Sequence, residues 1–377
     1  MSFVWPKNSN HTTTFLSNGQ LRSWEKDGYL VIPNIFRPNH LQDSANAIRE
    51  FVGANEHDKE SWYKNTLDIY TDKTPDGKRP HHGPCGVVQL VHHRALWELR
   101  QEPRLHAAFS DLYGTHRLFV TADRAHFKPP QSLNHPEWSN PGNVHVGLHW
   151  DVDTRRVAWP IPYVIQGVVY LEDTAADQGA LRLVPGFHHR FSEWDSKQPE
   201  NRSGERPEGE AAEALEREAI AIAGPAGSLI VWHSLLPHGP AKNLHTRPRV
   251  SAYVTMLPVN ASKYLGPGRG ENEPLGMSDA GTLQYWDGWA VSSKSMQEAP
   301  TSSSCVEDGA NFSVQGVRRR QSRDRRVERW RLRLPLLDED PGEEELAFRP
   351  LGEEAGMPAS LTPLGRKLVG LDVWEDG

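Results

Sequence analysis

The sequence predicts a mainly β fold, a sandwich or a jelly roll, with helices packed outside it. Between residues 117 and 260, several short segments are rich in β-branched and aromatic residues and are separated by glycine and proline. They read RLFVTADRAHFK, YVIQGVVYLED, ALRLVPG, GSLIVWHS and RVSAYVTMLP. Before residue 117, apolar residues recur instead at the spacing of amphipathic helices. We therefore expect an outer layer of helices around a β core.

The N-terminal part predicts a helix, a strand and then two further helices. Ser17 followed by Gln20 resembles a capping box, and Gly28 is suited to end the helix that begins there. The apolar segment YLVIPNIF follows and predicts a strand. Helices are expected over residues 38–52 and 103–114, where apolar residues have helical spacing and a proline stands in the first turn.

Composition narrows the function classes. The chain has 377 residues, of which 37% are apolar, so it can bury a large core. Its formal net charge of -7 offers no global attraction to nucleic acid or to an anionic membrane, and no segment approaches eighteen consecutive apolar residues. The two cysteines, Cys85 and Cys305, form neither a disulfide framework nor a cysteine metal site. We expect a cytoplasmic protein without nucleic-acid or membrane partners.

The chain divides by composition into three parts. We expect a single catalytic domain over residues 1–290, with its jelly-roll core at about 117–260. Residues 291–317 are rich in serine and predict a flexible insertion. Residues 318–377 predict a charged C-terminal extension that packs back on the domain. Its run of nine arginines precedes the acidic segment DEDPGEEE, which favours a charge-paired helix over a nucleic-acid site.

A polar segment interrupts the predicted strands at residues 195–218. Its high charge places it on the surface, and its second half is suited to a short helix. Two interpretations stay open, because such a segment is either a solvated insertion or a cover over a site.

The motif His-Trp-Asp at residues 149–151 is the first candidate for chemistry. Alternate residues of a strand point to the same face, so on a strand His149 and Asp151 converge while Trp150 faces the other way. A neutral imidazole and a carboxylate are suitable ligands for a divalent first-row metal. The triplet alone arises easily by chance, and a further ligand is needed.

A distal segment supplies a ligand and a cation. His238 follows an apolar strand and a turn, and Arg249 begins the next strand eleven residues later. His149, Asp151 and His238 would form the two-histidine, one-carboxylate arrangement that leaves adjacent positions open on iron(II). His233, at the end of the strand SLIVWH, is the main rival for the third position.

The open positions on such a metal suit a bidentate 2-oxo acid and dioxygen. The far carboxylate of 2-oxoglutarate then needs a cationic fork, which arginine provides through two parallel hydrogen bonds. Arg249 fits that role, and Ser251, on the same face of the strand, is suited to donate a second hydrogen bond. Arg247 competes with Arg249, but Pro248 separates it from the strand.

These residues resemble the phytanoyl-CoA dioxygenase family of iron(II)- and 2-oxoglutarate-dependent oxygenases. The resemblance covers roughly residues 20 to 260. It rests on LRSWEKDGYLVIPNIF, on FKPP at 127–130, on HWD at 149–151, on YLEDTAADQGALRLVPGFHH at 170–189, and on the interval between His238 and Arg249. It implies a double-stranded β-helix (a cupin-like jelly roll) with flanking helices. It also implies that His149, Asp151 and His238 hold Fe(2+) and that Arg249 holds 2-oxoglutarate.

Two features depart from the family pattern. Trp150 stands where the family often has glutamine, and residues 291–333 have no counterpart that we can identify. Halogenating relatives replace the carboxylate ligand with a small residue, so Asp151 favours hydroxylation or a related oxidation.

The resemblance implies a dioxygenase that oxidises a C–H bond of a small organic or acyl substrate with dioxygen, releasing succinate and carbon dioxide. Two alternative functions differ from this one in the residues that they require. A non-catalytic jelly-roll module that binds a small molecule would not need the complete ligand set. A zinc hydrolase could use the same three ligands, but it has no need of Arg249.

Overall fold

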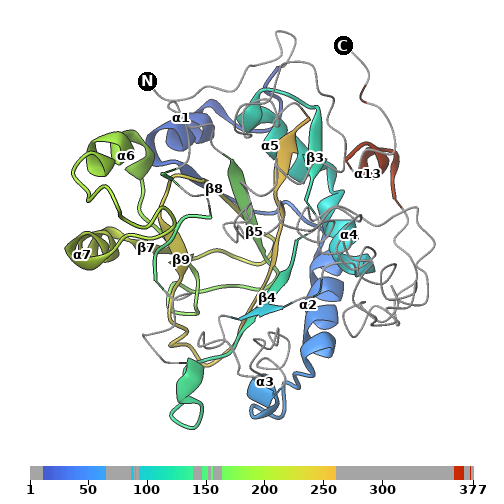
Figure 1. Ribbon diagram of the computed structural model, residues 1–377. Helices are drawn as coiled ribbons and strands as arrows, with labels where there is room; N and C mark the ends of the chain where they lie inside the picture. The colour runs from blue at the N-terminus through green and yellow to red at the C-terminus, as the bar shows by residue number, and fades with distance from the viewer. Residues whose placement is uncertain are drawn as a thin grey trace, which may run out of the picture.

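The computed structural model places a β core between two groups of helices (Figure 1). The residues it describes are 12–64, 86–88, 90, 93–121, 123–138, 147–151, 154–155, 164–259, 361–368 and 374. The predicted flexible insertion at 291–317 and the arginine run lie outside these residues. The division of the chain into three parts therefore stays a prediction.

The larger sheet is antiparallel and has six strands in the order β1-β8-β5-β10-β4-β2. Their bounds are Tyr29–Ile32 (β1), Leu229–His233 (β8), Ile165–Tyr170 (β5), Arg249–Tyr253 (β10), Ala125–Lys128 (β4) and Val87–Val88 (β2). In this register Gln166 lies opposite Trp232, and Ser251 lies opposite Tyr170. The strands from the predicted β segments are thus confirmed, but their neighbours are mostly distant in sequence.

A smaller sheet packs against one face of the larger one. Its strands are β7 (Ile220–Ile222), β6 (Leu181–Leu183) and β9 (His238–Pro240). A buried cluster contains Val168 and Ile230 from the large sheet together with Leu181 and Leu183 from the small one. A further pair of strands, β3 (Leu118–Val120) and β11 (Met256–Pro258), lies beside this core. The two packed sheets form the predicted jelly-roll core.

The other face of the large sheet is covered by helices. Val169, Leu229 and Val250 from this face share a second buried cluster, the helix-side cluster, with residues of the helices α2, α4 and α5. The helices are α1 (Asn18–Asp27), α2 (Pro38–Val52), α3 (Ser61–Lys64), α4 (Arg94–Arg100), α5 (Pro103–Tyr113), α6 (Phe187–Asp195), α7 (Gly209–Glu218) and α13 (Pro363–Leu368), with a 3-10 turn at Pro136–Trp138. Successive residues of the central strands therefore point alternately to one buried cluster and to the other, as expected for a sheet that is buried on both faces.

The predicted helix ends agree with the structure. Ser17 caps α1 with its side chain, Gln20 completes the capping box, and Gly28 ends the helix with a φ of 73°. Pro38 begins α2 and Gly53 ends it, while Gly114 ends α5 in the same left-handed conformation. These signals act within one turn of chain, which explains why sequence alone located them.

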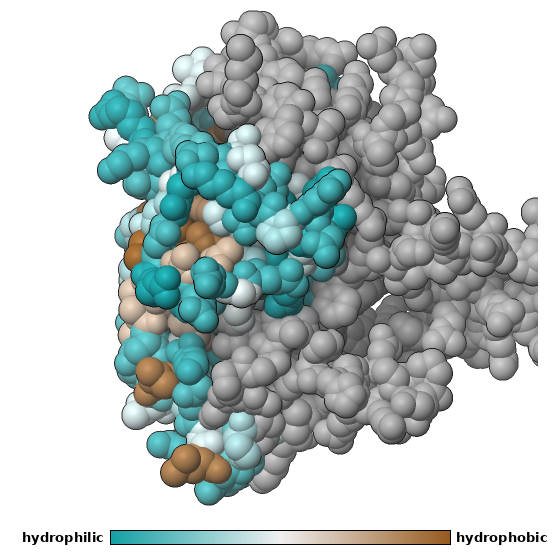
Figure 2. Space-filling model, turned by 60° about the vertical axis from the view of Figure 1, so that its left-hand side comes forward, coloured by the Kyte–Doolittle hydropathy of each residue, from teal (hydrophilic) through white to brown (hydrophobic). Residues whose placement is uncertain are grey.

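Part of the C-terminal segment contacts the core. Leu368 and Trp374 are buried in the cluster beneath the helices, and the indole nitrogen of Trp374 donates to the carbonyl of Leu118 at 3.2 Å. Within the described part of the chain, none of the helices has the length and hydrophobicity of a membrane span. The surface over α6 and α7 is mostly hydrophilic (Figure 2), and the large exposed apolar side chains of the described residues are Leu133, Ile220 and Leu244.

Stacked histidines join α6 to the end of β8. His188 stacks on His233 with ring centroids 4.9 Å apart, and its Nε2 lies 3.2 Å from the carbonyl oxygen of Glu25 in α1. Burial, and then the neighbouring His189, lower the pKa of His188 to about 4. Burial and His188 likewise lower the pKa of His233. Both rings are therefore neutral in the folded protein at neutral pH.

This cluster predicts that the folded protein loses stability as the pH falls from about 6.5 toward 4. Unfolded histidines bind protons at an ordinary pKa of about 6.5, whereas the buried rings resist protonation. The stabilisation is complete above that pKa. About 1–2 kcal/mol of the free energy of unfolding is lost between about pH 6.5 and pH 4, a value reduced to allow for the partial exposure of His188. Urea denaturation at several pH values checks this expectation. His188→Leu should flatten the pH dependence and the exposed His57→Gln should not; equal slopes for native protein and H188L would contradict it.

Candidate functional site

Three side chains from two neighbouring segments converge at one end of the smaller sheet. His149 and His238 are backbone partners, with N–H to carbonyl hydrogen bonds of 2.8 and 2.9 Å in the two directions. Asp151 Oδ1 lies 3.6 Å from His149 Nε2, and Asp151 Oδ2 lies 3.3 Å from His238 Nε2. The potential ligand atoms all lie within 4.8 Å of one another, which is close enough for one metal ion with bonds of about 2 Å.

The backbone orients both imidazoles. His149 Nδ1 lies 3.2 Å from the carbonyl oxygen of Gly147, and His238 Nδ1 lies 3.0 Å from that of Leu236. Because a carbonyl only accepts, a proton on each Nδ1 leaves the lone pair of each Nε2 for a metal ion bound between the rings and Asp151. Such a fixed tautomer is typical of histidines that ligate metals.

The predicted strand over residues 149–151 is wrong in its local structure. His149 forms an isolated bridge with His238, and Asp151 lies in a bend. The cause is a change of partner, because the N–H of Trp150 donates to the carbonyl of Glu205 at 2.8 Å rather than to β9. His149 and Asp151 converge as expected, but the bend brings them together instead of a strand's alternation.

Trp150 faces away from the ligands, as expected, and anchors their segment. Its side chain is almost fully buried, and its indole nitrogen donates to the carbonyl of Leu235 at 2.9 Å. The ring packs against Phe187, Phe191 and Trp194 of α6, with centroids between 5.4 and 6.1 Å away. The indole therefore ties the segment between the two ligands to a helix outside the core.

Trp150→Ala is expected to reduce the free energy of unfolding by about 3–5 kcal/mol, because it leaves a large cavity against α6. It should also weaken metal binding, since both flanking ligands lose their anchor. Trp150→Phe keeps most of the apolar contacts and should cost clearly less. Urea denaturation of the two variants checks the order. A loss below about 1 kcal/mol for the alanine variant would contradict the anchoring role.

Electrostatics favour the protonation states that a metal needs at His149 and Asp151. Burial, and then His238, lower the pKa of His149 to about 4. Burial opposes the charged form of Asp151, but the contact with His238, with smaller contributions from His149 and Gln166, holds its pKa well below the usual range. At neutral pH the site therefore offers a carboxylate at Asp151 and a neutral imidazole at His149. The side chain of Asp151 is 42% exposed and that of His238 only 5%, so the site opens on the Asp151 side.

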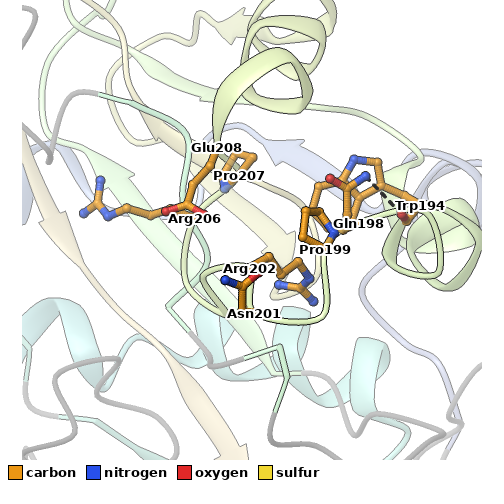
Figure 3. Close-up of a pocket in the computed structure, with 8 residues that line it drawn as sticks. All are labelled: Trp194, Gln198, Pro199, Asn201, Arg202, Arg206, Pro207 and Glu208. Atoms are coloured by element: carbon orange, nitrogen blue, oxygen red, sulfur yellow. Dashed lines mark hydrogen bonds between the residues drawn. The ribbon is translucent and has the colours of Figure 1, made fainter.

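The polar segment at 195–218 flanks the ligands. Its second half is the helix α7, as expected. The carbonyl of Gly204 accepts from the N–H of Thr154 at 2.9 Å. With the bond from Trp150 to Glu205, this is a second backbone contact between the polar segment and the segment that carries His149 and Asp151. Figure 3 shows a pocket between this segment and Trp194 of α6, with Arg206 directed away from Gln198 and Trp194. The pocket contains none of the three ligands; its lining residues are Trp194, Gln198, Pro199, Asn201, Arg202, Arg206, Pro207 and Glu208.

Arg249 and Ser251 lie on β10 with their side chains on the inner face of the large sheet. Val250 and Ala252 belong to the helix-side cluster, so their neighbours along the strand point to the side of the smaller sheet. Arg249 is buried, and its Nη1 donates to the carbonyl of Gly179 at 2.6 Å. The Nε of Arg249 and the Oγ of Ser251 are buried without a hydrogen-bond partner. Unpaired buried donors are costly, and a carboxylate is the acceptor that would satisfy both.

The two rival residues lie elsewhere. His233 is outside the cluster of potential metal ligands, and its Nδ1 accepts from the N–H of Leu235 at 3.0 Å. Arg247 is exposed, and its N–H donates to His245 at 3.2 Å.

Sequence reasoning missed Gln166. Its amide Nε2 donates to Asp151 Oδ2, so it contacts a potential metal ligand from the neighbouring strand β5. A signal was present, because Gln166 is the one strongly polar residue in the strand IQGVVY, whose residues are all buried. A buried amide in such a strand needs partners, and these can indicate a site.

A comparison with known families gives one decisive match. The model of the family described as "Phytanoyl-CoA dioxygenase (PhyH)" matches residues 24–251, more than half of the chain. The chain belongs to this family. The match includes the three potential metal ligands, Arg249 and Ser251. The predicted enzyme class is thereby confirmed: this PhyH-family protein is an iron(II)- and 2-oxoglutarate-dependent dioxygenase.

Two curated proteins are among its relatives. A putative phytanoyl-CoA dioxygenase of Dictyostelium discoideum is 24% identical over 275 residues, covering 64% of this chain and 76% of the relative. An ectoine dioxygenase of Bordetella bronchiseptica is 23% identical over 253 residues, covering 63% and 74%. Among solved structures, apo EctD from S. alaskensis is similar with a TM-score of 0.45 and 19% identity, covering 72% of this chain and 87% of its own.

Proposed function

We propose that His149, Asp151 and His238 bind the iron of this dioxygenase and that Arg249 and Ser251 bind the distal carboxylate of 2-oxoglutarate. The observation that carries the proposal is the combination of two sites on the inner side of one jelly roll. One is the cluster of three ligand atoms, and the other is the pair of buried, unpartnered donors on β10. A zinc hydrolase would need the first but not the second.

The protein's own residues have distinct tasks in this proposal. The carbonyl of Gly179 holds the guanidinium of Arg249, which leaves Nε and the remaining Nη positions for a carboxylate. Burial makes this charge-assisted contact stronger than it would be in water. The carbonyls of Gly147 and Leu236 hold the imidazoles so that their Nε2 atoms face the metal position. Bound iron(II) would supply the activation of dioxygen, with 2-oxoglutarate converted to succinate and carbon dioxide.

The substrate in this proposal is a small organic or acyl molecule with a C–H bond that is oxidised, most simply by hydroxylation. Asp151 supports hydroxylation because the carboxylate ligand is present. Dioxygen is the second substrate, and nucleic acid has no role, which agrees with the net charge of -7. We place the enzyme in the cytoplasm because the two cysteines provide no disulfide framework.

Succinate formation tests the proposed function directly. Purified full-length protein is incubated with iron(II), 2-oxoglutarate and oxygen, and succinate is measured across a panel of organic acids, acyl thioesters and amides. We expect succinate only with iron, and more of it with a suitable substrate. Hydrolysis supported by zinc without succinate would favour the hydrolase. Binding of organic compounds without metal binding or turnover would favour the non-catalytic module.

A further inference from the structure

Gln166 contacts the proposed iron site with one end of its amide and carries an unpaired atom at the other end. Its amide nitrogen donates to Asp151 Oδ2. A carboxylate only accepts hydrogen bonds, so this contact determines which end of the amide faces Asp151 and which end faces away. The oxygen, Oε1, is buried and has no hydrogen-bond partner. An unsatisfied buried acceptor is costly, and a donor that arrives with a ligand would remove the cost.

Trp232 presents the complementary group on the neighbouring strand. Trp232 of β8 lies directly opposite Gln166 of β5, and such cross-strand partners have Cβ atoms about 4.5–5.5 Å apart. The indole nitrogen, Nε1, is also buried without a partner. The Trp232 ring lies 5.0 Å from the ring of His238. Two cross-strand neighbours beside the ligands therefore carry an unpaired acceptor and an unpaired donor, and these do not satisfy each other.

The other participants in the reaction do not satisfy Gln166. Ionised 2-oxoglutarate and succinate carry only acceptors, and dioxygen carries no donor. The position of the proposed carboxylate site also separates it from Gln166. Ser251 lies opposite Tyr170, four residues along β5 from Gln166, which is about 13 Å on a strand. Among the participants in the reaction, the organic substrate and water are therefore the ones that can supply an N–H or O–H to Oε1.

We propose that Gln166 is a positioning and specificity residue, whose nitrogen holds the carboxylate of Asp151 and whose oxygen accepts a hydrogen bond from the organic substrate. Together with Trp232 it selects a substrate that carries a donor and an acceptor side by side, as an amide or lactam does, near the carbon that is oxidised. The opening beside Asp151 gives such a group its approach. The proposal rests on the proposed function, because it takes the three ligands to hold the metal.

The experiment uses cobalt(II), a redox-stable substitute for iron(II), and a matched pair of probes. Full-length protein is saturated with cobalt(II) and 2-oxoglutarate, and its visible ligand-field absorption is followed during titration with 2-pyrrolidinone or N-methyl-2-pyrrolidinone. The two lactams share a carbonyl, but only the first has an N–H. We expect the native protein to bind the N–H lactam about 5- to 10-fold more tightly.

Three variants separate the contributions. Gln166→Met should remove the preference for the N–H lactam and weaken cobalt binding by about 10- to 100-fold, as is typical for loss of a partner behind a metal ligand. Trp232→Phe removes the N–H donor and keeps an aromatic ring, so it should weaken binding of both lactams and leave the ratio of their affinities unchanged. Gln101→Met is the matched control, since Gln101 is a buried glutamine whose Oε1 accepts from the N–H of Thr362 at 2.7 Å in the outer layer. It should change neither ratio nor metal binding.

The outcomes are distinct. Equal binding of the two lactams by native protein, or no binding of either, would mean that water alone serves Oε1, and this would overturn the inference. A preference that survives in Q166M would overturn it as well. Native protein that fails to bind cobalt(II) and 2-oxoglutarate would instead contradict the proposed function.

Discussion

Asp151→Ala is expected to abolish binding of the metal and, with it, the formation of succinate. Asp151 contributes the negative charge of the cluster, and its two oxygens face His149 and His238. Loss of a residue that hydrogen-bonds to a metal ligand typically lowers metal affinity about 10- to 100-fold. Loss of the ligand itself should therefore lower the affinity by more than about 100-fold. Isothermal titration with cobalt(II) and the succinate assay measure the two effects separately.

Two further variants make this test specific. Asp151→Asn keeps the shape of the side chain without its charge, and it should bind metal nearly as poorly as the alanine variant. Asp173→Ala removes an exposed carboxylate that accepts from the N–H of Ala226 at 2.8 Å, and it should bind metal as the native protein does. Native-like metal binding by D151A would show that the iron site lies elsewhere.

Arg249→Leu is expected to raise the KM for 2-oxoglutarate strongly while metal affinity stays close to native. Removing one partner of a buried, hydrogen-bonded charge pair costs about 2–5 kcal/mol, which corresponds to a rise of roughly 30-fold to several thousand-fold. The leucine fills part of the space but offers no donor to a carboxylate. Steady-state kinetics with varied 2-oxoglutarate, together with cobalt titration, measure the two quantities.

Arg249→Lys and Arg247→Leu complete this comparison. Lysine keeps the charge but lacks the planar guanidinium group. The KM of the Arg249→Lys variant for 2-oxoglutarate should therefore lie between those of the native protein and R249L. Arg247 is exposed two residues earlier, and its replacement should leave the KM unchanged. A larger effect at Arg247 than at Arg249 would reverse our choice between the two arginines.

Local signals predicted the elements of the fold well. The capping box at Ser17, the glycine at 28 and the proline at 38 act within a few residues, and the helices they delimit have the expected bounds. Strand composition located β5, β8 and β10. The order of the strands was beyond such signals, because β1 pairs with β8 about 200 residues later in the chain.

Local signals failed where distant partners decide the conformation. The segment at 149–151 has the composition of a strand, but hydrogen bonding to Glu205 bends it. His188 belongs to a helix and stacks on His233, a contact between separate elements. The role of Gln166 depends on Asp151, which lies 15 residues away in the chain and contacts it across the core.

The sequence by itself supplied the candidate donor set, because imidazole, carboxylate and guanidinium groups have chemistry that does not depend on the fold, and the PhyH family model spans all of these residues. Only the tertiary structure decided which of several histidines and arginines meet inside the core. It also showed which buried atoms lack a partner, as Oε1 of Gln166 and Nε of Arg249 do. Hydrogen-bond satisfaction depends on packing between segments far apart in sequence, so no local pattern reports it.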